Sequence, residues 1–300
     1  MTVVHTVADL RAARQKLKSK VGFVPTMGNL HEGHLNLVQH AFKDCNSVIA
    51  SIFVNPAQFA VGEDLDKYPR TLERDLEMLK EMGTDLVFVP SVKEMYPSGI
   101  VLELNEQQGT FVEVKGKSHQ MEGTIRPHFF RGVATVVCKL FNAVQPDKAY
   151  FGQKDAQQCV VVRTMVRDLL MPIEIVISPT MREKDGLAMS SRNGYLTKED
   201  REAAPILYQG LMRAYKLFKE EGVVDRDTLL SEAAKVIETE KRVKLEYLSL
   251  AHFDHIKEIK TIDKDGAIIS GAIKTTSTRL IDNLYLKMDQ ENDFLMTRKN

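Results

Sequence analysis

The sequence predicts an α/β protein with a Rossmann-like, doubly wound parallel sheet in its N-terminal domain and a smaller α+β C-terminal domain. Apolar strand-like segments alternate with amphipathic helical patterns between residues 21 and 89, as in nucleotide-binding α/β folds. After about residue 180 the pattern changes to long helices followed by three β-like segments. We therefore expect a first domain over residues 1–180 and a second over residues 181–300.

The elements of the first half follow from hydrophobic period. Leu35, Val38, Phe42 and Cys45 recur every three or four positions, which indicates a helix that begins near His31. The run 48–54 is almost continuously apolar, as is typical of a parallel strand covered on both faces. The same reasoning predicts helices over 7–18, 72–82, 133–144 and about 156–169, and strands over 21–24, 86–89, 148–151 and 173–177.

The second half is expected to open with a loop over residues 180–195. Helices are then predicted over 198–221 and 226–239, followed by strands near 244–252, 267–271 and 277–286. Residues 91–130 contain Pro, Gly and scattered charges and are expected to form long connections. The polar residues 290–300 are expected to be a frayed end.

Composition excludes several classes of protein. Forty-one basic residues balance 41 acidic ones, so no excess charge favours a nucleic acid or an anionic membrane surface as partner. The longest apolar runs are too short to span a bilayer, and the first 17 residues do not resemble a secretory signal, so a cytoplasmic protein is expected. Cys45, Cys138 and Cys159 lack CxxC spacing and are expected to be reduced, buried residues.

The segment from Pro25 to His34 is the strongest functional signal. An apolar strand runs into a turn with Gly28, and a helix follows with His31 and His34 in its first turn. Unpaired N–H groups and the positive end of the helix dipole favour phosphate there, and two imidazoles add donors. A single histidine at a helix start would more often be only a polar residue, but this order of strand, turn and His-x-Gly-His favours a nucleotide site.

Three further groups follow predicted strands or open the second domain. Asn55 and Gln58 come after a buried strand, where two neutral amides are expected to face the crevice, although Asn-Pro is also ordinary turn chemistry. Gly152-Gln153-Lys154-Asp155 leads into a helix and offers a mobile cation, or simply a capped helix start. Met189-Ser190-Ser191-Arg192 supplies hydroxyls and a guanidinium suited to phosphate oxygens.

The loop over residues 115–131 carries Arg126, His128 and Arg131, which either approach an anionic ligand or are solvated. This loop alone does not distinguish the two.

Together these motifs resemble the pantothenate synthetase (pantoate–β-alanine ligase) family within the HxGH nucleotidylyltransferase superfamily. The matching runs are Pro25-Thr-Met-Gly28, His31-Glu-Gly-His34, Ser51-Ile-Phe-Val-Asn-Pro56, Gln58-Phe59, Glu63-Asp-Leu-Asp66, Tyr68-Pro-Arg70, Phe151-Gly-Gln-Lys-Asp-Ala-Gln-Gln158 and Ser190-Ser-Arg-Asn193. The resemblance is dense over residues 20–200 and looser beyond.

The resemblance implies a cytoplasmic homodimer that joins pantoate to β-alanine, using ATP with Mg²⁺ and releasing AMP and pyrophosphate. It implies catalytic roles for His31, His34, Lys154 and Arg192, with His34 as a proton donor, and pantoate binding by Gln58 and Gln158, with Gln58 also near β-alanine. The implied ATP-binding residues are Pro25, Thr26, Met27, Gly28, His31, Gly33, His34, Gly152, Gln153, Lys154, Asp155, Met181, Met189, Ser190, Ser191 and Arg192. The ligands of Mg²⁺ are left open.

The residues themselves leave two alternative functions open. Another HxGH adenylyltransferase would keep the nucleotide motifs, but a phosphorylated acceptor would need a basic pocket, whereas Gln58 and Gln158 are neutral. A non-catalytic nucleotide-binding module would not need the Ser190-Ser191-Arg192 loop in addition to the other phosphate motifs.

Overall fold

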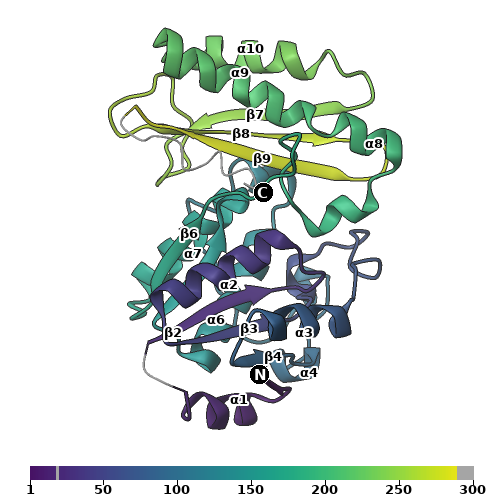
Figure 1. Cartoon of the computed structure of the whole chain (residues 1–300), viewed down its shortest axis with the longest axis vertical. Coiled ribbons are helices and arrows are strands. Elements are labelled where there is room, and N and C mark those ends of the chain that lie inside the picture. The colour runs from purple at the N-terminus through teal and green to yellow at the C-terminus, as the bar shows by residue number, and fades with distance from the viewer. Residues whose placement is uncertain (18–19, 289–300) are drawn as a thin grey trace. The chain divides into compact units, whose positions relative to one another are not determined.

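The computed structural model describes residues 1–17 and 20–288, and the polar end predicted over residues 290–300 lies outside the described part. The chain divides into two compact units (Figure 1). Unit 1 comprises residues 1–152 and 157–178, and unit 2 comprises residues 153–156 and the chain from Pro179 onward. Residues 153–156, which the sequence analysis assigns to the first domain, thus group with unit 2.

Unit 1 is built on a six-stranded parallel sheet in the order β1-β4-β3-β2-β5-β6. Its strands are β1 (Thr2–Val4), β2 (Val21–Thr26), β3 (Ser47–Ile52), β4 (Leu86–Phe88), β5 (Lys148–Gly152) and β6 (Glu174–Ser178). Its helices are α1 (Val7–Arg14), α2 (Glu32–Asp44), α3 (Leu72–Glu81), α4 (Val92–Met95), α5 (Glu122–Ile125), α6 (Phe129–Val144) and α7 (Ala156–Asp168), with 3₁₀ turns η1 (Pro56–Gln58) and η2 (Leu104–Glu106).

Both faces of this sheet are covered, as the solid apolar pattern of β3 predicts. One face packs against α1, α6 and α7, with Phe23 and Phe88 in its core. The other packs against α2 and α3, with Val24 and Val87 in its core. Successive residues of a strand therefore enter opposite cores, and the predicted doubly wound parallel fold is confirmed.

Unit 2 has a three-stranded antiparallel sheet in the order β7-β8-β9, against which helices pack. Its elements are η3 (Gln153–Asp155), η4 (Ser191–Tyr195), α8 (Lys198–Ala203), α9 (Ile206–Glu221), α10 (Arg226–Ile237), β7 (Lys244–Ala251), β8 (Ala267–Lys274) and β9 (Arg279–Leu286). The single helix predicted over 198–221 is wrong: it is two helices, because Pro205 has no N–H to continue α8.

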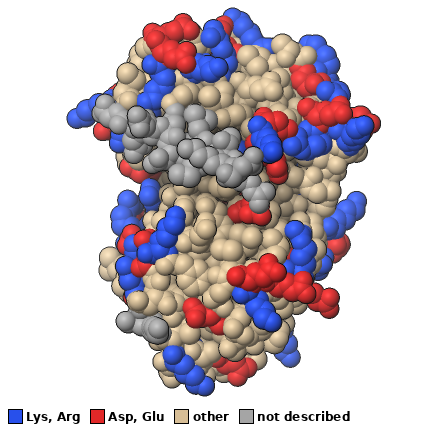
Figure 2. All heavy atoms as spheres, viewed as in Figure 1, with Lys and Arg blue, Asp and Glu red and all other residues tan. Residues whose placement is uncertain are grey.

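Other differences are small. Strand β1 was not predicted, because its three residues are too short for a periodic signal, and α4 and α5 lie in the segment predicted to be long connections. Cys45 and Cys159 are buried as expected, whereas Cys138 is half-exposed. Lys and Arg are interspersed with Asp and Glu over the face shown in Figure 2, in keeping with the balanced composition.

Candidate active site

The strand order of unit 1 reverses between β2 and β5. From β2 the sheet continues through β3 and β4, whereas from β5 it continues on the other side through β6. In open α/β sheets, ligands bind outside the carboxyl ends of strands at such a reversal. Both strands carry predicted motifs there, since β2 ends at Thr26 and β5 ends at Gly152.

The turn after β2 is tightly organised. The Thr26 hydroxyl donates to the Ser51 carbonyl at 2.8 Å and accepts from the Gly28 N–H at 3.2 Å. Gly28 has a φ of +83°, and a Cβ added there would lie 3.0 Å from a carboxylate oxygen of Asp75 and 3.1 Å from Ile52. The left-handed backbone therefore favours glycine, and a Cβ there would also crowd the Asp75 carboxylate.

His31 and His34 form a reciprocal cap at the start of α2. His31 is the N-cap, and its Nδ1 accepts from the Gly33 N–H at 3.1 Å, while Nδ1 of His34 accepts from the His31 N–H at 3.3 Å. The two rings lie with their centroids 4.1 Å apart. A nitrogen that accepts carries no hydrogen, so each neutral ring has its hydrogen on Nε2. Both imidazoles are thereby set as Nε2–H donors.

The amide of Gln58 is oriented by its neighbours. Asn55 donates to Gln58 Oε1 at 3.0 Å, which directs the Gln58 NH₂ group to the sulfur of Met27 at 3.2 Å. Asn55 in turn accepts from the Tyr96 hydroxyl at 2.6 Å, and burial raises the pKa of Tyr96, which keeps this donor protonated. The expectation that both amides face the crevice is wrong for Asn55, which is 1% exposed with partners inside the protein.

Helix α6 packs directly on the turn that carries Gln58. A Cβ at Gly132 would lie 2.1 Å from the Ala57 carbonyl oxygen and 2.6 Å from the Gln58 Cα. Only glycine permits this approach.

The two arginines of the preceding loop have protein partners. Arg126 pairs with Glu63 and donates to the Gln58 carbonyl at 3.2 Å, and Arg131 donates to Gln107 and lies over the ring of Phe111. These protein partners do not support the expectation that the two arginine side chains are simply solvated.

In unit 2, strand β9 forms hydrogen bonds to η3, the segment 153–155 that contains Lys154 and is here called the lysine loop. Asn283, 2% exposed, donates to the carbonyl oxygens of Gln153 at 3.0 Å and Lys154 at 2.9 Å. The side-chain oxygen of Asn283, Oδ1, accepts from the side-chain NH₂ group of Gln153 at 3.2 Å. The ammonium of Lys154 lies 3.6 Å from a carboxylate oxygen of Asp155. An amide side chain of β9 therefore fixes the backbone of two predicted ATP-binding residues.

The segment that carries Met181 and Met189 is anchored to the same strand. Met189 N–H donates to the Met181 carbonyl at 2.9 Å, which closes a hairpin. Between them, Arg182 is 2% exposed and forms a two-pronged ion pair with Asp282, the neighbour of Asn283. Ser190 then caps η4, in which Ser191 and Arg192 lie.

The predicted residues thus fall into two groups. Unit 1 holds Pro25 to His34, Gln58, Gly152 and Gln158, the last half-buried on α7, and Met27 touches Gln58. Unit 2 holds residues 153–155, Met181 and residues 189–192, all attached through β9 or the hairpin beside it. Sequence reasoning gave no role to Asp75, Tyr96, Gly132 and Asn283, which lie far along the chain from the groups they hold.

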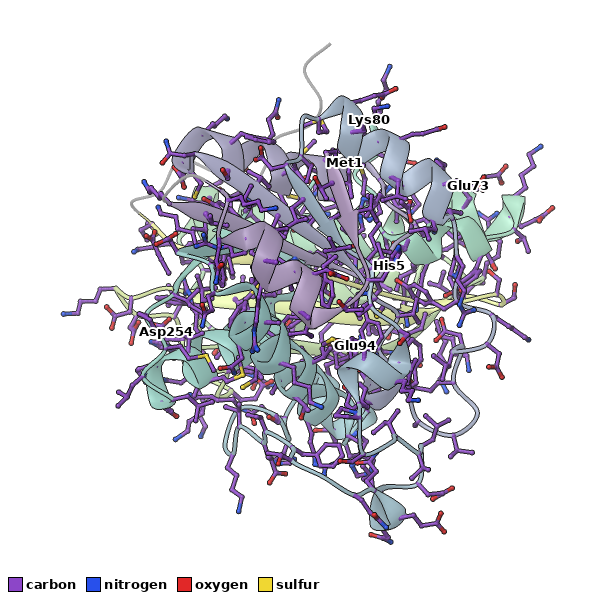
Figure 3. All side chains as sticks on the ribbon, turned by 90° about the horizontal axis from the view of Figure 1, so that it is seen from below. Met1, His5, Glu73, Lys80, Glu94 and Asp254 are labelled. Carbon is purple, nitrogen blue, oxygen red and sulfur yellow. The ribbon has the colours of Figure 1, made fainter. Side chains whose placement is uncertain are left out.

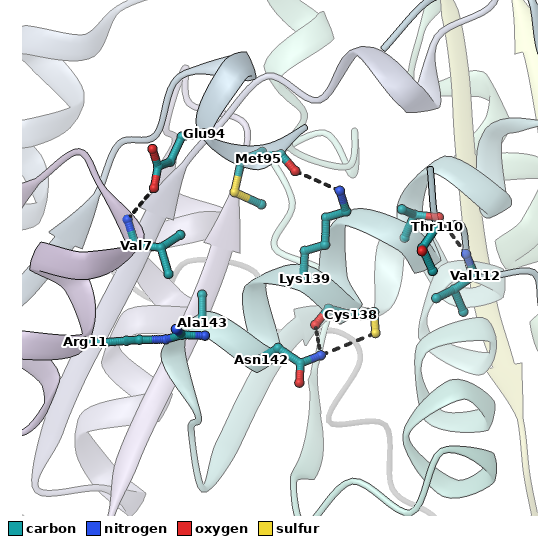
Figure 4. Close-up of a pocket in the computed structure, with 11 residues that line it drawn as sticks. Val7, Arg11, Glu94, Met95, Thr110, Val112, Cys138, Lys139, Asn142 and Ala143 are labelled. Atoms are coloured by element: carbon teal, nitrogen blue, oxygen red, sulfur yellow. Dashed lines mark hydrogen bonds between the residues drawn. The ribbon is translucent and has the colours of Figure 1, made fainter. Parts of the chain in front are cut away.

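A pocket of about 360 Å³ lies elsewhere in unit 1 (Figure 4). Its lining includes Val7, Met95, Cys138 and Lys139, and no predicted site residue. The Lys139 ammonium donates to the Met95 carbonyl at 2.7 Å and lies over the Tyr96 ring, so this cation serves the packing of α4 on α6.

Among the described residues, no cluster of three or more His, Cys, Asp or Glu side chains is arranged to hold a metal ion. None of the helices in the described ranges is long and apolar enough to cross a membrane.

Comparison with known proteins gives one consistent result. A family model described as pantoate-beta-alanine ligase matches residues 2–285. The chain is 52% identical to the pantothenate synthetase of Chloroflexus aggregans, over 95% of this chain and 100% of that protein. The crystal structure of pantothenate synthetase from Thermus thermophilus matches with a TM-score of 0.88 at 45% identity, covering 96% of this chain and 100% of that one. That of Francisella tularensis pantoate-beta-alanine ligase, complexed with beta-gamma ATP and beta-alanine, matches with a TM-score of 0.76 at 32% identity, covering 95% and 97%.

Proposed function

Because the chain belongs to the pantoate–β-alanine ligase family, we propose that it condenses (R)-pantoate with β-alanine at the expense of ATP, releasing AMP and pyrophosphate. The observation that carries this proposal is the motif-bearing turn at the reversal of the sheet, in a chain that matches the family over residues 2–285.

The chemistry requires two steps. A carboxylate does not accept an amine directly, because oxide would have to leave. The pantoate carboxylate therefore attacks the α-phosphorus of ATP, and pyrophosphate leaves as pantoyl adenylate forms. The β-alanine amine then attacks the acyl carbon, the bond to AMP breaks, and the amine loses a proton as the amide forms. Since the substrates supply both nucleophiles, the protein contributes positioning and charge stabilisation.

We assign the ATP contacts of unit 1 to the turn after β2 and the start of α2, residues 25–34. We assign those of unit 2 to the segment 153–155, which contains Lys154, and to the segment 189–192, which contains Ser190 and Ser191. His31 and His34 donate hydrogen bonds from Nε2 to phosphate oxygens, and His34 serves as the proton donor. Lys154 and Arg192 balance the charge of the departing pyrophosphate. The remaining contacts come from Pro25, Thr26, Met27, Gly28, Gly33, Gly152, Gln153, Asp155, Met181, Met189, Ser190 and Ser191.

Pantoate is assigned to the two glutamines. The Gln58 amide is held by Asn55 beside Met27, a predicted ATP-binding residue, so a hydroxy acid bound to it would have the nucleotide as neighbour. Gln158 completes the pantoate contacts, and Gln58 also serves β-alanine. Neutral amides suit an attacking carboxylate, since a paired cation would reduce its nucleophilicity.

Mg²⁺ fits this set of residues as an ion carried by ATP. It prefers oxygen ligands and is commonly held by substrate phosphates with one or two carboxylates, and Asp155 is such a carboxylate beside Lys154. When bound, it would neutralise phosphate charge.

Exchange of labelled pyrophosphate into ATP tests the function. The purified chain should catalyse exchange only when pantoate is present, because adenylation must be reversed to remake ATP. Exchange without any acid, or only with a phosphorylated acceptor, would assign the chain to another nucleotidyl transfer. Absence of exchange together with ATP binding would make it a non-catalytic module.

We also propose that the enzyme is a cytoplasmic homodimer, as the family resemblance implies. Light scattering of the purified chain should give about twice its 33.9 kDa mass, and a monomer that retains full turnover would contradict this.

A further inference from the structure

Asp75 is an unusual residue for its position on α3. The other charged residues of this helix are exposed, and the side chains of Glu73 and Lys80 project outward from the protein (Figure 3). Asp75 is fully buried, with 0% of its surface exposed. Burying a carboxylate costs several kcal/mol unless hydrogen bonds compensate for the lost water, so a retained buried Asp calls for an explanation.

The partners of Asp75 lie in the turn that leads to the paired histidines. One carboxylate oxygen accepts from the Asn29 N–H at 2.8 Å, and the other accepts from the Leu30 N–H at 2.9 Å. The second oxygen also accepts from the Thr71 hydroxyl at 3.1 Å. Three donors thus converge on two oxygens, a set that a carboxylate satisfies and an amide does not.

The turn at residues 28–30 has an energetically unfavourable backbone conformation. Gly28 and Asn29 are consecutive left-handed residues, with φ of +83° and +50°. The left-handed conformation costs a non-glycine residue about 1–2 kcal/mol, although Asn tolerates it better than most. After Leu30 comes His31, the N-cap of α2, and the position of its ring depends on the path of the backbone through this turn.

We propose that Asp75 is a positioning residue of the ATP site. Its carboxylate fixes the turn at residues 28–30 and thereby sets the Nε2–H donors of His31 and His34. The inference rests on the proposed role of these histidines in ATP binding. Asp75 itself touches no substrate, because both of its oxygens are engaged below the turn.

Asp75→Asn is the direct test. It places an NH₂ group against a backbone N–H, so the turn must shift while the side-chain volume is kept. Displacement of a catalytic group by about 1 Å can cost on the order of 10²-fold in rate. We expect pantoate-dependent pyrophosphate exchange to fall about 10- to 100-fold in kcat/KM for ATP, with the KM for β-alanine in the second step unchanged.

The chain offers a matched control in Asp85→Asn. The Asp85 carboxylate also accepts a hydrogen bond from a backbone N–H of unit 1, that of Val48 at 2.8 Å. This contact lies at the start of β3, whereas the candidate ATP-binding motifs follow the carboxyl ends of the strands. We expect a comparable loss of thermal stability with wild-type kinetics. Equal losses of activity in both variants, or none in Asp75→Asn, would overturn the proposal.

Thr71→Val provides a second route if Asp75→Asn does not fold. It removes one donor to the carboxylate and should change the same kinetic constant in the same direction, by about two- to tenfold. Unchanged kinetics in Thr71→Val would count against the positioning role. If the wild-type chain itself catalyses no pantoate-dependent exchange, the proposed function is wrong, and the positioning role of Asp75 in that reaction is wrong with it.

Discussion

At the scale of single residues, the decisive property of the site is the hydrogen on each imidazole. The cap of α2 uses Nδ1 of both His31 and His34 as acceptors, so the helix start is held by one edge of each ring, and the donation to phosphate proposed above would use the opposite edge. Sequence alone predicted the pair and its place at a helix start. It could not predict the tautomer, because that depends on distances within the turn.

Two substitutions of His34 separate these edges. His34→Asn keeps an acceptor near Nδ1 and removes the outer donor, so we expect it to fold normally and to lose about 10²–10³ in adenylation rate, the usual cost of one preorganised donor. His34→Gln keeps a donor near Nε2 and loses the cap, so it should retain more activity and lose about 1 kcal/mol of stability. Single-turnover kinetics and thermal unfolding measure the two effects, and the reverse ranking of activities would contradict the assignment.

At the scale of helices and strands, contacts between elements explain the roles of residues that sequence motifs did not identify. Gly132 and Asn283 carry no recognisable chemistry, yet one lets α6 reach the Gln58 turn and the other ties β9 to the Lys154 loop. The alternation of strands and helices predicts which residues end a strand. It does not predict which distant side chain will hold the following turn, because that depends on three-dimensional register.

Gly132→Ala should disrupt the packing of α6 on η1. The added Cβ would lie 2.1 Å from the Ala57 carbonyl oxygen, so backbone must move, at a cost of about 1–3 kcal/mol or more. We expect a lower thermal midpoint and weaker pantoate binding, measured by calorimetry. Gly194→Ala is the control for stability, since its Cβ would meet nothing within 4 Å and its φ is not positive.

Asn283→Leu should leave the Gln153 and Lys154 carbonyls without their donor. An unpaired buried carbonyl costs about 1–3 kcal/mol, and we expect turnover to fall about tenfold or more as the lysine loop loosens. In a Lys154→Ala background the same change should add little, because both act on one group. Additive losses of kcat in the double variant would show that Asn283 does not act through Lys154.

At the scale of the whole molecule, both units combine apolar cores with buried polar contacts. Unit 1 is a sheet with two apolar cores, a pattern that alternating hydrophobic segments predict well. Unit 2 also relies on buried polar groups, such as Arg182 with Asp282, whose pairing no sequence period indicates. The fold class was therefore predictable, whereas the polar supports of the second unit were not.

Asp200 makes the stability of unit 2 sensitive to acid. Hydrogen bonds from Ser277 and Thr276 lower the pKa of this buried carboxylate to about 2. A folded-state pKa below the unfolded value stabilises the fold above about pH 4, and this contribution is lost as the pH falls through 2. Thermal unfolding from pH 7 to pH 2 should show that loss in the wild type.

Asp200→Asn should be less stable at neutral pH and should lack this part of the pH dependence. Glu240→Gln is the matched control. Hydrogen bonds from Arg242 lower the pKa of Glu240 to about 2 as well, but the pair lies at the surface, where it is worth little. An Asp200→Asn profile parallel to that of the wild type would contradict the assignment.

The grouping of residues 153–156 with unit 2 bears on any attempt to dissect the chain. These four residues follow β5 and end at the first residue of α7, yet the carbonyls of Gln153 and Lys154 accept hydrogen bonds from Asn283, more than 120 positions later in the chain. A fragment that ends at Ser178 would contain residues 153–156 but not β9. The complementary fragment would contain β9, but the side-chain amide of Asn283 would lack its acceptors. We therefore expect neither fragment to be active alone, and activity from separately expressed fragments should require that the two be refolded together.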